Sequence, residues 1–217
     1  MIDYEAARIA MVDCQVRPSD VTSFPIIQAM LSVPRERFVP AALRPVCHAG
    51  GDLAIGGGRT LLDPRVFAKM LDAADIGPDD LVLDIACGLG YSSAVLARLA
   101  AAVVAVESDE GLARHAAQTL SDIEADTAMV ENRPLAEGAP EQAPYNVIFI
   151  NGGLETVPAA IADQLREGGR MVAVDMSDGV GRVCVWTRGP GGLARRRAFD
   201  ATAPVLDGFR KKAEFVF

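Results

Sequence analysis

The chain is poor in the residues that build metal sites and disulfide frameworks. It has two histidines, His48 and His115, and its four cysteines lie far apart without a Cys-x-x-Cys pair. A structural zinc site needs four such ligands at characteristic close spacings. The sequence therefore predicts no metal site and no disulfide scaffold.

Long hydrophobic runs are also missing. A membrane-spanning helix takes about 20 apolar residues, and no segment approaches that length. The first five residues lack the basic start and apolar core of a secretory signal. We therefore expect a cytoplasmic protein in a reducing environment, without a membrane partner.

Positive charge is in deficit as well. The chain has 21 lysines and arginines against 29 acidic residues, a formal net charge of −8. Such a surface repels phosphate backbones, so we expect no nucleic-acid partner. The basic clusters at residues 195–197 and 210–212 are interpreted as solvated segments.

The sequence does have enough hydrophobic residues to form the core of one α/β domain. Half of the 217 residues are hydrophobic, and a chain of this length buries roughly 70% of its unfolded surface. We expect an N-terminal helical cap and a glycine-rich loop over residues 1–62, followed by an α/β domain over residues 63–217. The oligomeric state is not predicted.

The most informative segment is residues 81–91, Leu-Val-Leu-Asp-Ile-Ala-Cys-Gly-Leu-Gly-Tyr. Its apolar start predicts a buried strand, and Gly88 and Gly90 allow a tight turn whose amides approach a ligand closely. A second buried strand over 103–106 ends at Glu107, about 20 residues beyond the turn, where an acid can bind ribose hydroxyls. The pattern predicts a nucleotide-type site; the alternative is a tight turn that binds nothing.

The spacing of small residues limits which class of ligand the turn can bind. There is no third glycine for a dinucleotide and no Gly-Lys-Ser/Thr for a nucleoside triphosphate. The turn resembles motif I of class I methyltransferases, which implies S-adenosylmethionine as the cofactor. On that resemblance Asp84, Ala86, Gly88 and Gly90 shape its methionine end and Glu107 holds the ribose.

Alternating periodicities extend the α/β pattern along the chain. The strands are expected at residues 127–130, 145–150 and 170–174, with antiparallel edge strands at 183–186 and near Phe199 and Phe215, and the helices at 91–102, 109–120 and 157–166. Helices over 3–16 and from Ser23 form the cap. Residues 50–60 are expected as a flexible loop that could act as a lid, and Asp63 and Pro64 open a helix through Ala74.

Five segments in order resemble the protein-L-isoaspartate O-methyltransferase family. They are residues 33–40 (VPRERFVP), 53–60 (LAIGGGRT), 82–91 (VLDIACGLGY), 144–150 (PYNVIFI) and 158–170 (PAAIADQLREGGR). The first two are the most specific. The resemblance implies a Rossmann-like class I methyltransferase, a three-layer α/β sandwich with an N-terminal helical cap, that methylates isoaspartyl residues of damaged proteins.

The chain also departs from this family pattern. Leu62 stands where the family has a serine that reaches the substrate, and leucine cannot donate that hydrogen bond. The first glycine of the cofactor turn is Ala86. Glu131 and Asn132 stand where the family has Asp-Gly near the adenine. Asn151 stands at the end of the fourth strand, and it is a further candidate for cofactor binding.

Methylation of an ionised carboxylate needs alignment and desolvation but no general base. Thr60 and Asp63 are the candidate catalytic residues. Thr60 could bind substrate or cofactor, or satisfy the backbone of its own loop. For an alcohol or amine acceptor, Asp63, Glu155 and His48 are the candidate bases, although Asp63 also suits a helix cap. Two alternatives stay open: a methyltransferase with a changed acceptor, and a non-catalytic binding protein.

Overall fold

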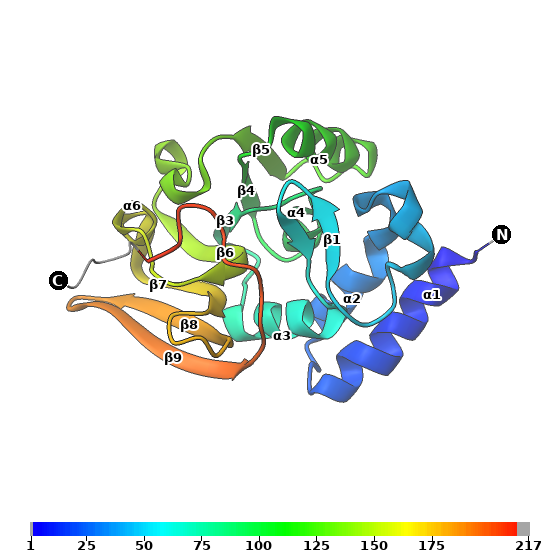
Figure 1. Cartoon of the computed structure of the whole chain (residues 1–217), viewed down its shortest axis with the longest axis horizontal. Coiled ribbons are helices and arrows are strands. Elements are labelled where there is room, and N and C mark those ends of the chain that lie inside the picture. Colours follow the sequence, from blue (N-terminus) through cyan, green and yellow to red (C-terminus); the bar gives the residue numbers. More distant parts are fainter. Residues whose placement is uncertain (1, 212–217) are drawn as a thin grey trace.

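The computed structural model describes residues 2–211, and a seven-stranded sheet forms its centre (Figure 1). The order of the strands across the sheet is β5-β4-β3-β6-β7-β8-β9. The strands are β3 (Leu81–Ile85), β4 (Ala102–Glu107), β5 (Ala128–Asn132), β6 (Tyr145–Leu154), β7 (Leu165–Asp175), β8 (Arg182–Gly189) and β9 (Gly192–Asp200). The pairs from β5 to β7 are parallel, and β7, β8 and β9 form an antiparallel meander.

The strand register determines which residues meet at the carboxyl edge of the sheet. Ile85, the last residue of β3, pairs with Val106 of β4 and with Ile150 of β6. Glu107 pairs with Asn132 at the end of β5. The turn after β3 therefore lies between the ends of its two neighbouring strands, in the crevice where open parallel sheets bind ligands.

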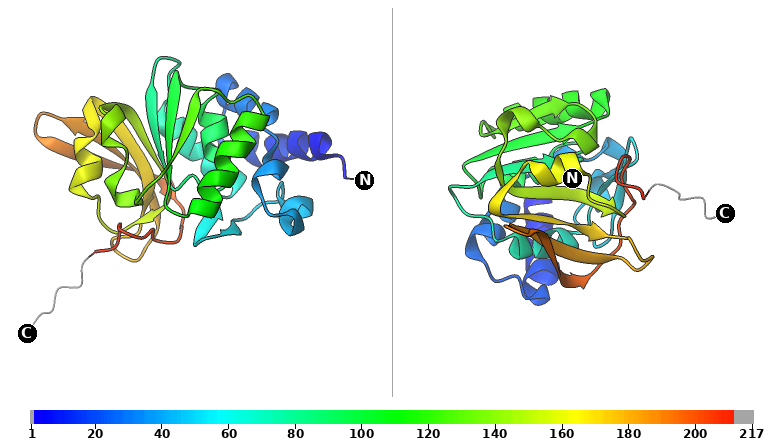
Figure 2. Two further views of the ribbon diagram at one scale, coloured as in Figure 1. Left: turned by 90° about the horizontal axis from the view of Figure 1, so that it is seen from above. Right: turned by 90° about the vertical axis from the view of Figure 1, so that its left-hand side faces the viewer.

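Helices cover both faces of the sheet, as two views at right angles show (Figure 2). The helices are α1 (Tyr4–Met11), α2 (Phe24–Ser32), α3 (Pro64–Ala74), α4 (Tyr91–Leu96), α5 (Glu110–Asp122) and α6 (Ala159–Asp163). Successive residues of β6 alternate between two apolar clusters. Val147 and Phe149 belong to the cluster that includes residues of the cap, α3 and α4, and Ile148 and Ile150 to the one that includes Ile161 of α6 and Phe209. This three-layer, Rossmann-like arrangement confirms the predicted fold class.

The N-terminal helices form the expected cap at the end of the molecule opposite the β8–β9 hairpin (Figures 1 and 2). α1 continues into η1 (Val12–Val16), which packs against α3, and α2 packs against α3 and α4. Pro25 lies in the first turn of α2, where Ile26, Ile27 and Met30 are buried and Leu31 is half-buried. One apolar cluster runs from this cap into the sheet, and the division of the chain at residue 62 stays a prediction.

Short helical turns complete the chain. They are η2 (Arg17–Ser19), η3 (Arg35–Phe38), η4 (Ala41–Val46), η5 (Leu135–Glu137) and η6 (Pro140–Gln142). Among residues 2–211, no helix combines the length and apolar character needed to cross a bilayer.

Residues 50–60 differ from the expected flexible loop, because they contain most of an antiparallel hairpin of β1 (Leu53–Gly56) and β2 (Arg59–Leu61). Gly57 and Gly58 have positive φ angles of 56° and 70°, so they form the hairpin turn and not a disordered tract. The alternation of Ile55, Arg59 and Leu61 as buried residues is the strand signal that the glycines obscured.

Two predicted helices are shorter than expected. α4 ends at Leu96 and not at residue 102. α6 ends at Asp163 and not at residue 166, because β7 begins at Leu165. Pairing of Leu165 with Tyr145 of β6 outweighs local helix propensity there. The expected edge strand near Phe199 is part of β9, whereas Phe215 lies outside the described residues.

Candidate cofactor and methyl-transfer site

The turn after β3 has the conformation that its small residues predict. Ala86, Gly88 and Gly90 have φ angles of 60°, 58° and 95°, and Gly90 caps the start of α4. A left-handed conformation costs a residue with a side chain roughly 1–2 kcal/mol, so Ala86 is strained where the two glycines are not. The turn thus takes a left-handed path through Ala86 at a cost that a glycine would not incur.

Asp84, in β3 just before the turn, is fully buried. Its carboxylate accepts hydrogen bonds from Ser92 Oγ at 2.7 Å, Ser93 Oγ at 2.6 Å and Asn151 Nδ2 at 2.6 Å. Burial raises the pKa of Asp84 to about 6, even though these donors act to lower it. Asp84 therefore connects β3 to α4 and to β6 by hydrogen bonds, and these bonds hold the turn between β3 and α4 in place.

Glu107, at the end of β4, is also fully buried. Its carboxylate accepts the amide hydrogens of Gly88 at 3.0 Å and Asp109 at 2.9 Å. The Arg59 guanidinium donates to both oxygens of the same carboxylate, with Nη2 at 2.8 Å from Oε1 and Nε at 2.9 Å from Oε2. The acid predicted to hold ribose is thus in place, and a residue from the hairpin binds it.

Arg59 has no role in the sequence-based interpretation, and the structure gives it a central one. It is buried, and its guanidinium also donates to Ser108 Oγ at 2.7 Å and to the carbonyl of Gly57 at 3.2 Å. Because Glu107 is 48 residues away in the chain, no local pattern in the sequence reveals this ion pair.

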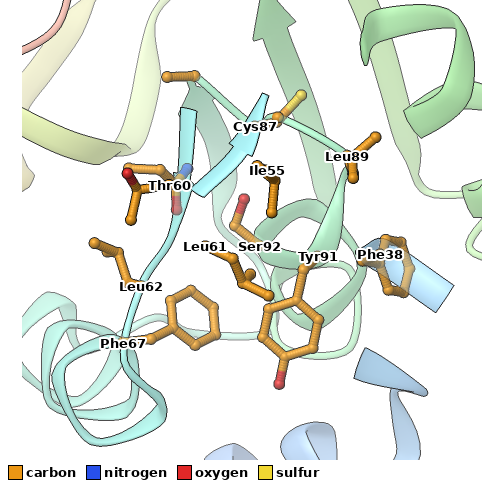
Figure 3. A pocket seen from close by; sticks show the side chains of 13 residues that line it. Phe38, Ile55, Thr60, Leu61, Leu62, Phe67, Cys87, Leu89, Tyr91 and Ser92 are labelled. Atoms are coloured by element: carbon orange, nitrogen blue, oxygen red, sulfur yellow. The ribbon is translucent and has the colours of Figure 1, made fainter. Parts of the chain in front are cut away.

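The hairpin lies directly over the glycine turn (Figure 3). A Cβ atom added at Gly88 would lie 2.7 Å from Ile55 Cδ1, and one added at Gly57 would lie 2.8 Å from Leu112 Cδ1. Gly88 therefore allows the hairpin and the turn to approach each other. A cavity of about 20 Å³ remains between them, room for about one water molecule.

One of the two candidate catalytic residues lies at this cavity. Thr60 lines it together with Leu62 and Asn151. Asp63 is the N-cap of α3: its Oδ1 accepts from the amides of Arg65 at 2.8 Å and Val66 at 3.2 Å, as the capping signal predicts. Its Oδ2 accepts from the amide of Gly51 at 2.6 Å, so both oxygens have backbone partners.

The residues predicted near adenine lie at the end of β5, beside Glu107. Asn132 Nδ2 donates to the carbonyl of Glu107 at 2.8 Å. Glu131 pairs with Arg133 at 3.0 Å and accepts from Gln142 Nε2 at 2.9 Å. Neither side chain lines the cavity, so their contact with the cofactor stays a prediction.

The two further candidate bases lie outside the cavity. His48 is buried beside Glu36, with 3.4 Å between Nε2 and Oε2. Burial lowers its pKa. Glu155 accepts the amide hydrogen of Lys211 at 2.7 Å. Among residues 2–211, no cluster of histidine, cysteine and acidic side chains could hold a metal ion.

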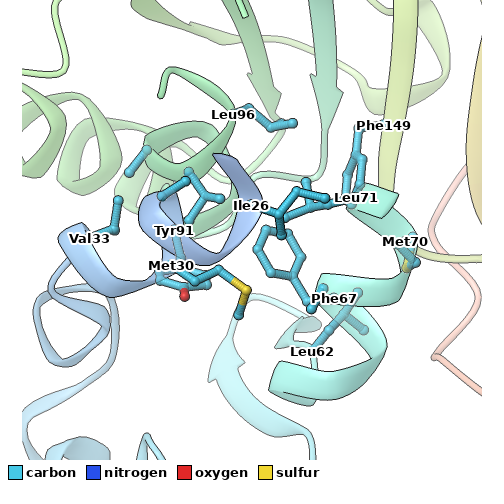
Figure 4. Close-up of a cluster of buried hydrophobic side chains, with 14 of the residues drawn as sticks. Ile26, Met30, Val33, Leu62, Phe67, Met70, Leu71, Tyr91, Leu96 and Phe149 are labelled. Atoms are coloured by element: carbon cyan, nitrogen blue, oxygen red, sulfur yellow. The ribbon is translucent and has the colours of Figure 1, made fainter. Parts of the chain in front are cut away.

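Aromatic side chains form a wall of the cavity that the sequence analysis did not single out. The ring of Tyr91 lies 5.8 Å from that of Phe38 and 5.4 Å from that of Phe67. Phe67 in turn contacts Phe149 of β6, with 5.7 Å between the ring centres (Figure 4). The segment of residues 33–40 therefore supplies Phe38 to the site, and the rings connect the cap with α3, α4 and the sheet.

The residues present fit an adenosyl cofactor by their chemistry. Gly88 is a glycine in a left-handed conformation, so no Cβ blocks its approach to a ligand, and Glu107 offers a carboxylate at the neighbouring strand end. The hairpin, with Ile55 and Arg59, covers both groups.

Comparison with known proteins identifies the family of the chain. A family model described as protein-L-isoaspartate(D-aspartate) O-methyltransferase matches residues 9–180. The chain belongs to this family. It is therefore an S-adenosylmethionine-dependent O-methyltransferase, and the resemblance found in the sequence is confirmed.

Curated relatives support the assignment over most of the chain. A protein-L-isoaspartate O-methyltransferase of Pelotomaculum thermopropionicum is 37% identical over 166 residues, 76% of this chain and 72% of the relative. One of Gloeobacter violaceus is 36% identical over 190 residues, 87% of this chain and 93% of the relative.

A solved structure supports the fold. A protein described as a protein-L-isoaspartate O-methyltransferase from Plasmodium falciparum, in complex with S-adenosyl-L-homocysteine, superposes with a TM-score of 0.79. The match covers 95% of this chain and 99% of that one at 15% identity.

Proposed function

We propose that the chain transfers a methyl group from S-adenosylmethionine to the free carboxylate of isoaspartyl residues in damaged proteins and peptides. The observation that carries the proposal is the family match over residues 9–180, which takes in the cap, the hairpin and the glycine turn. Thr60 of the hairpin and Leu62 just after it line the cavity beside the turn, at the carboxyl edge of β3 and β6 where the acceptor would meet the methyl donor.

Each part of the site has a role in this proposal. The bound cofactor supplies a methyl group on a sulfonium, which an ionised carboxylate attacks in line without a general base. Glu107 holds the ribose, and the left-handed turn at Gly88 and Gly90 shapes the methionine end, with Asp84 fixing the turn. Glu131 and Asn132 lie toward adenine, and Asn151 lies between Asp84 and the cavity.

The acceptor side consists of Thr60 and apolar walls. The Thr60 hydroxyl can donate a hydrogen bond to the acceptor carboxylate. Leu61, Phe38 and Phe67 exclude water from the carboxylate, which makes it a better nucleophile. Asp63 acts in this proposal by fixing the start of α3, just beyond Leu62.

A cytoplasmic location is part of the same proposal. The cysteines Cys14, Cys47, Cys87 and Cys184 are free thiols, and Cys47, Cys87 and Cys184 are buried. Free thiols suit a reducing compartment.

The test compares two synthetic peptides that differ only in one residue, isoaspartate or aspartate. We expect the chain to methylate the isoaspartyl peptide alone, measured by radiolabel transfer and by the mass gain of one methyl group. Methylation of both peptides, or of neither, contradicts the proposal.

A methyltransferase with a changed acceptor is the second candidate, and Leu62 favours it. Its side chain is buried at the cavity, where the family serine would offer a hydroxyl. A hydrogen bond to a charged group contributes about 1.5–3 kcal/mol, so Leu62→Ser should raise kcat/KM on the isoaspartyl peptide about tenfold.

Leu61→Ser is the matched control, because it places a hydroxyl one residue away on the same cavity wall. It should leave kcat/KM no higher than that of the wild type. If the wild type and Leu62→Ser bind cofactor but neither methylates the isoaspartyl peptide, the changed-acceptor alternative is supported.

A further inference from the structure

We infer that Arg59 competes with the cofactor ribose for the Glu107 carboxylate, and that this competition sets how tightly the chain binds S-adenosylmethionine. The inference rests on the proposed function of Glu107 as the ribose-binding acid. It assigns to Arg59 and to the β1–β2 hairpin a part in cofactor binding.

The first argument is the number of acceptor positions on Glu107. A carboxylate has about four lone-pair positions. The amides of Gly88 and Asp109 take one on each oxygen, and Arg59 takes the remaining ones through Nε and Nη2. Two ribose hydroxyls need two acceptor positions, so they cannot bind this carboxylate while the guanidinium stays.

The second argument is the position of the hairpin. Ile55 covers Gly88 and Arg59 covers Glu107, and both residues come from the same two-stranded hairpin. The cavity of about 20 Å³ beside Ile55 has room for about one water molecule and is not lined by Glu107, whose side chain is fully buried. Entry of an adenosyl group therefore requires the hairpin to move away from the turn, and that movement withdraws Arg59 from Glu107.

The third argument is that the hairpin forms a sheet of its own. Among residues 2–211, β1 and β2 pair with each other in a sheet separate from the central one. Ile55 lies against the turn, Gly57 against α5, and β2 also contacts β6. The hairpin can thus move as a unit without breaking a hydrogen bond of the central sheet.

Arg59→Gln tests the inference in the full-length chain. Glutamine removes the charge and the paired donors, which frees acceptor positions on Glu107. We expect the dissociation constant for S-adenosylhomocysteine, measured by isothermal titration calorimetry, to fall at least tenfold. In methyl-transfer assays KM for S-adenosylmethionine should fall while kcat is little changed, a split that a general loss of structure would not produce.

Arg114→Gln is the matched control. Arg114 pairs with Glu110 at 2.5 Å on the exposed face of α5, so the substitution removes the same charge from an Arg–Glu pair that does not touch Glu107. We expect cofactor affinity within twofold of the wild type. Arg59→Lys keeps the charge but loses the paired geometry, and should give an intermediate affinity.

Hydrogen exchange on the wild type gives a readout that does not depend on any variant folding. Addition of S-adenosylhomocysteine should slow exchange of the amides in residues 86–91 and speed exchange in residues 53–61. A hairpin whose exchange slows or stays the same when ligand binds would overturn the inference, because Arg59 would then have kept its place.

The outcomes separate this inference from the proposed function. If Arg59→Gln binds ligand and the wild type does not, the inference holds and methyl transfer by the native chain fails. If the wild type binds and the folded variant binds no more tightly, the inference fails and the proposed function stands. If neither folded protein binds, both fail.

Discussion

Two buried carboxylates at adjacent strand ends are held in different ways. Asp84 is bound by neutral hydroxyl and amide groups from α4 and β6, all within the three-layer body of the molecule. Glu107 is bound by two backbone amides and by the guanidinium of Arg59, which comes from a hairpin outside the central sheet. The comparison teaches that the first acid fixes the turn, whereas the second can exchange its partner.

The largest expected effect comes from removing the exchangeable acid. Glu107→Ala leaves Arg59 buried without its counter-charge, which typically costs about 3–5 kcal/mol of unfolding free energy. It also removes the proposed ribose acceptor, so we expect affinity for S-adenosylhomocysteine to fall at least 100-fold. Urea denaturation and calorimetry measure the two effects.

Glu110→Ala is the control for that comparison, because Glu110 pairs with Arg114 on the surface. Exposed pairs contribute little, so its unfolding free energy should change by no more than about 0.5 kcal/mol. An equal loss of stability in both variants would show that the buried pair has no special weight.

The pH dependence of stability tests Asp84, the other of the two buried carboxylates. The pKa of Asp84 is raised to about 6 from 3.8 in the unfolded chain, so the folded state holds the proton more tightly. The stability contributed by that proton is complete below the unfolded pKa and is lost as the pH rises through the folded pKa.

Between pH 7.5 and pH 5 the wild type should therefore gain about 1 kcal/mol of unfolding free energy relative to Asp84→Asn, which cannot titrate. The difference between the two proteins, followed by urea denaturation at each pH, cancels the titration of all other groups. A flat difference, or one that reverses sign, would show that Asp84 is ionised and stabilised by its neighbours throughout.

The smallest effect concerns the strained residue of the turn. Ala86→Gly relieves the left-handed conformation but adds freedom to the unfolded chain, so we expect a gain of up to about 1 kcal/mol. Ala74→Gly, in the right-handed last turn of α3, is the control and should lose stability. A loss at Ala86 as well would mean that its methyl group packs too well to remove.

How much of this the sequence predicts depends on how local each signal is. The turn at Gly88, the cap at Asp63 and the acid at Glu107 are each predictable, because strand, capping and glycine signals extend over only a few residues. The hairpin over residues 53–61 was interpreted as a loop, because its glycines mask a short alternation. Arg59 could not be found, since its partner lies 48 residues away and only the fold brings them together.

The chemistry of the acceptor side is the least predictable part. Leu62 is recognisable as a departure from the family serine, but nothing in its own segment says that it lies buried beside the turn. The roles of Phe38 and Phe67 depend on packing between the cap, α3 and β6, which periodicity alone does not specify.

A crystal structure of the chain with S-adenosylhomocysteine bound tests the central claim most directly. We predict ribose hydroxyls on the Glu107 carboxylate, the adenosyl group against the Gly88 turn, and the Arg59 guanidinium withdrawn with its hairpin. Ligand bound elsewhere while Arg59 and Glu107 remain paired would contradict the account.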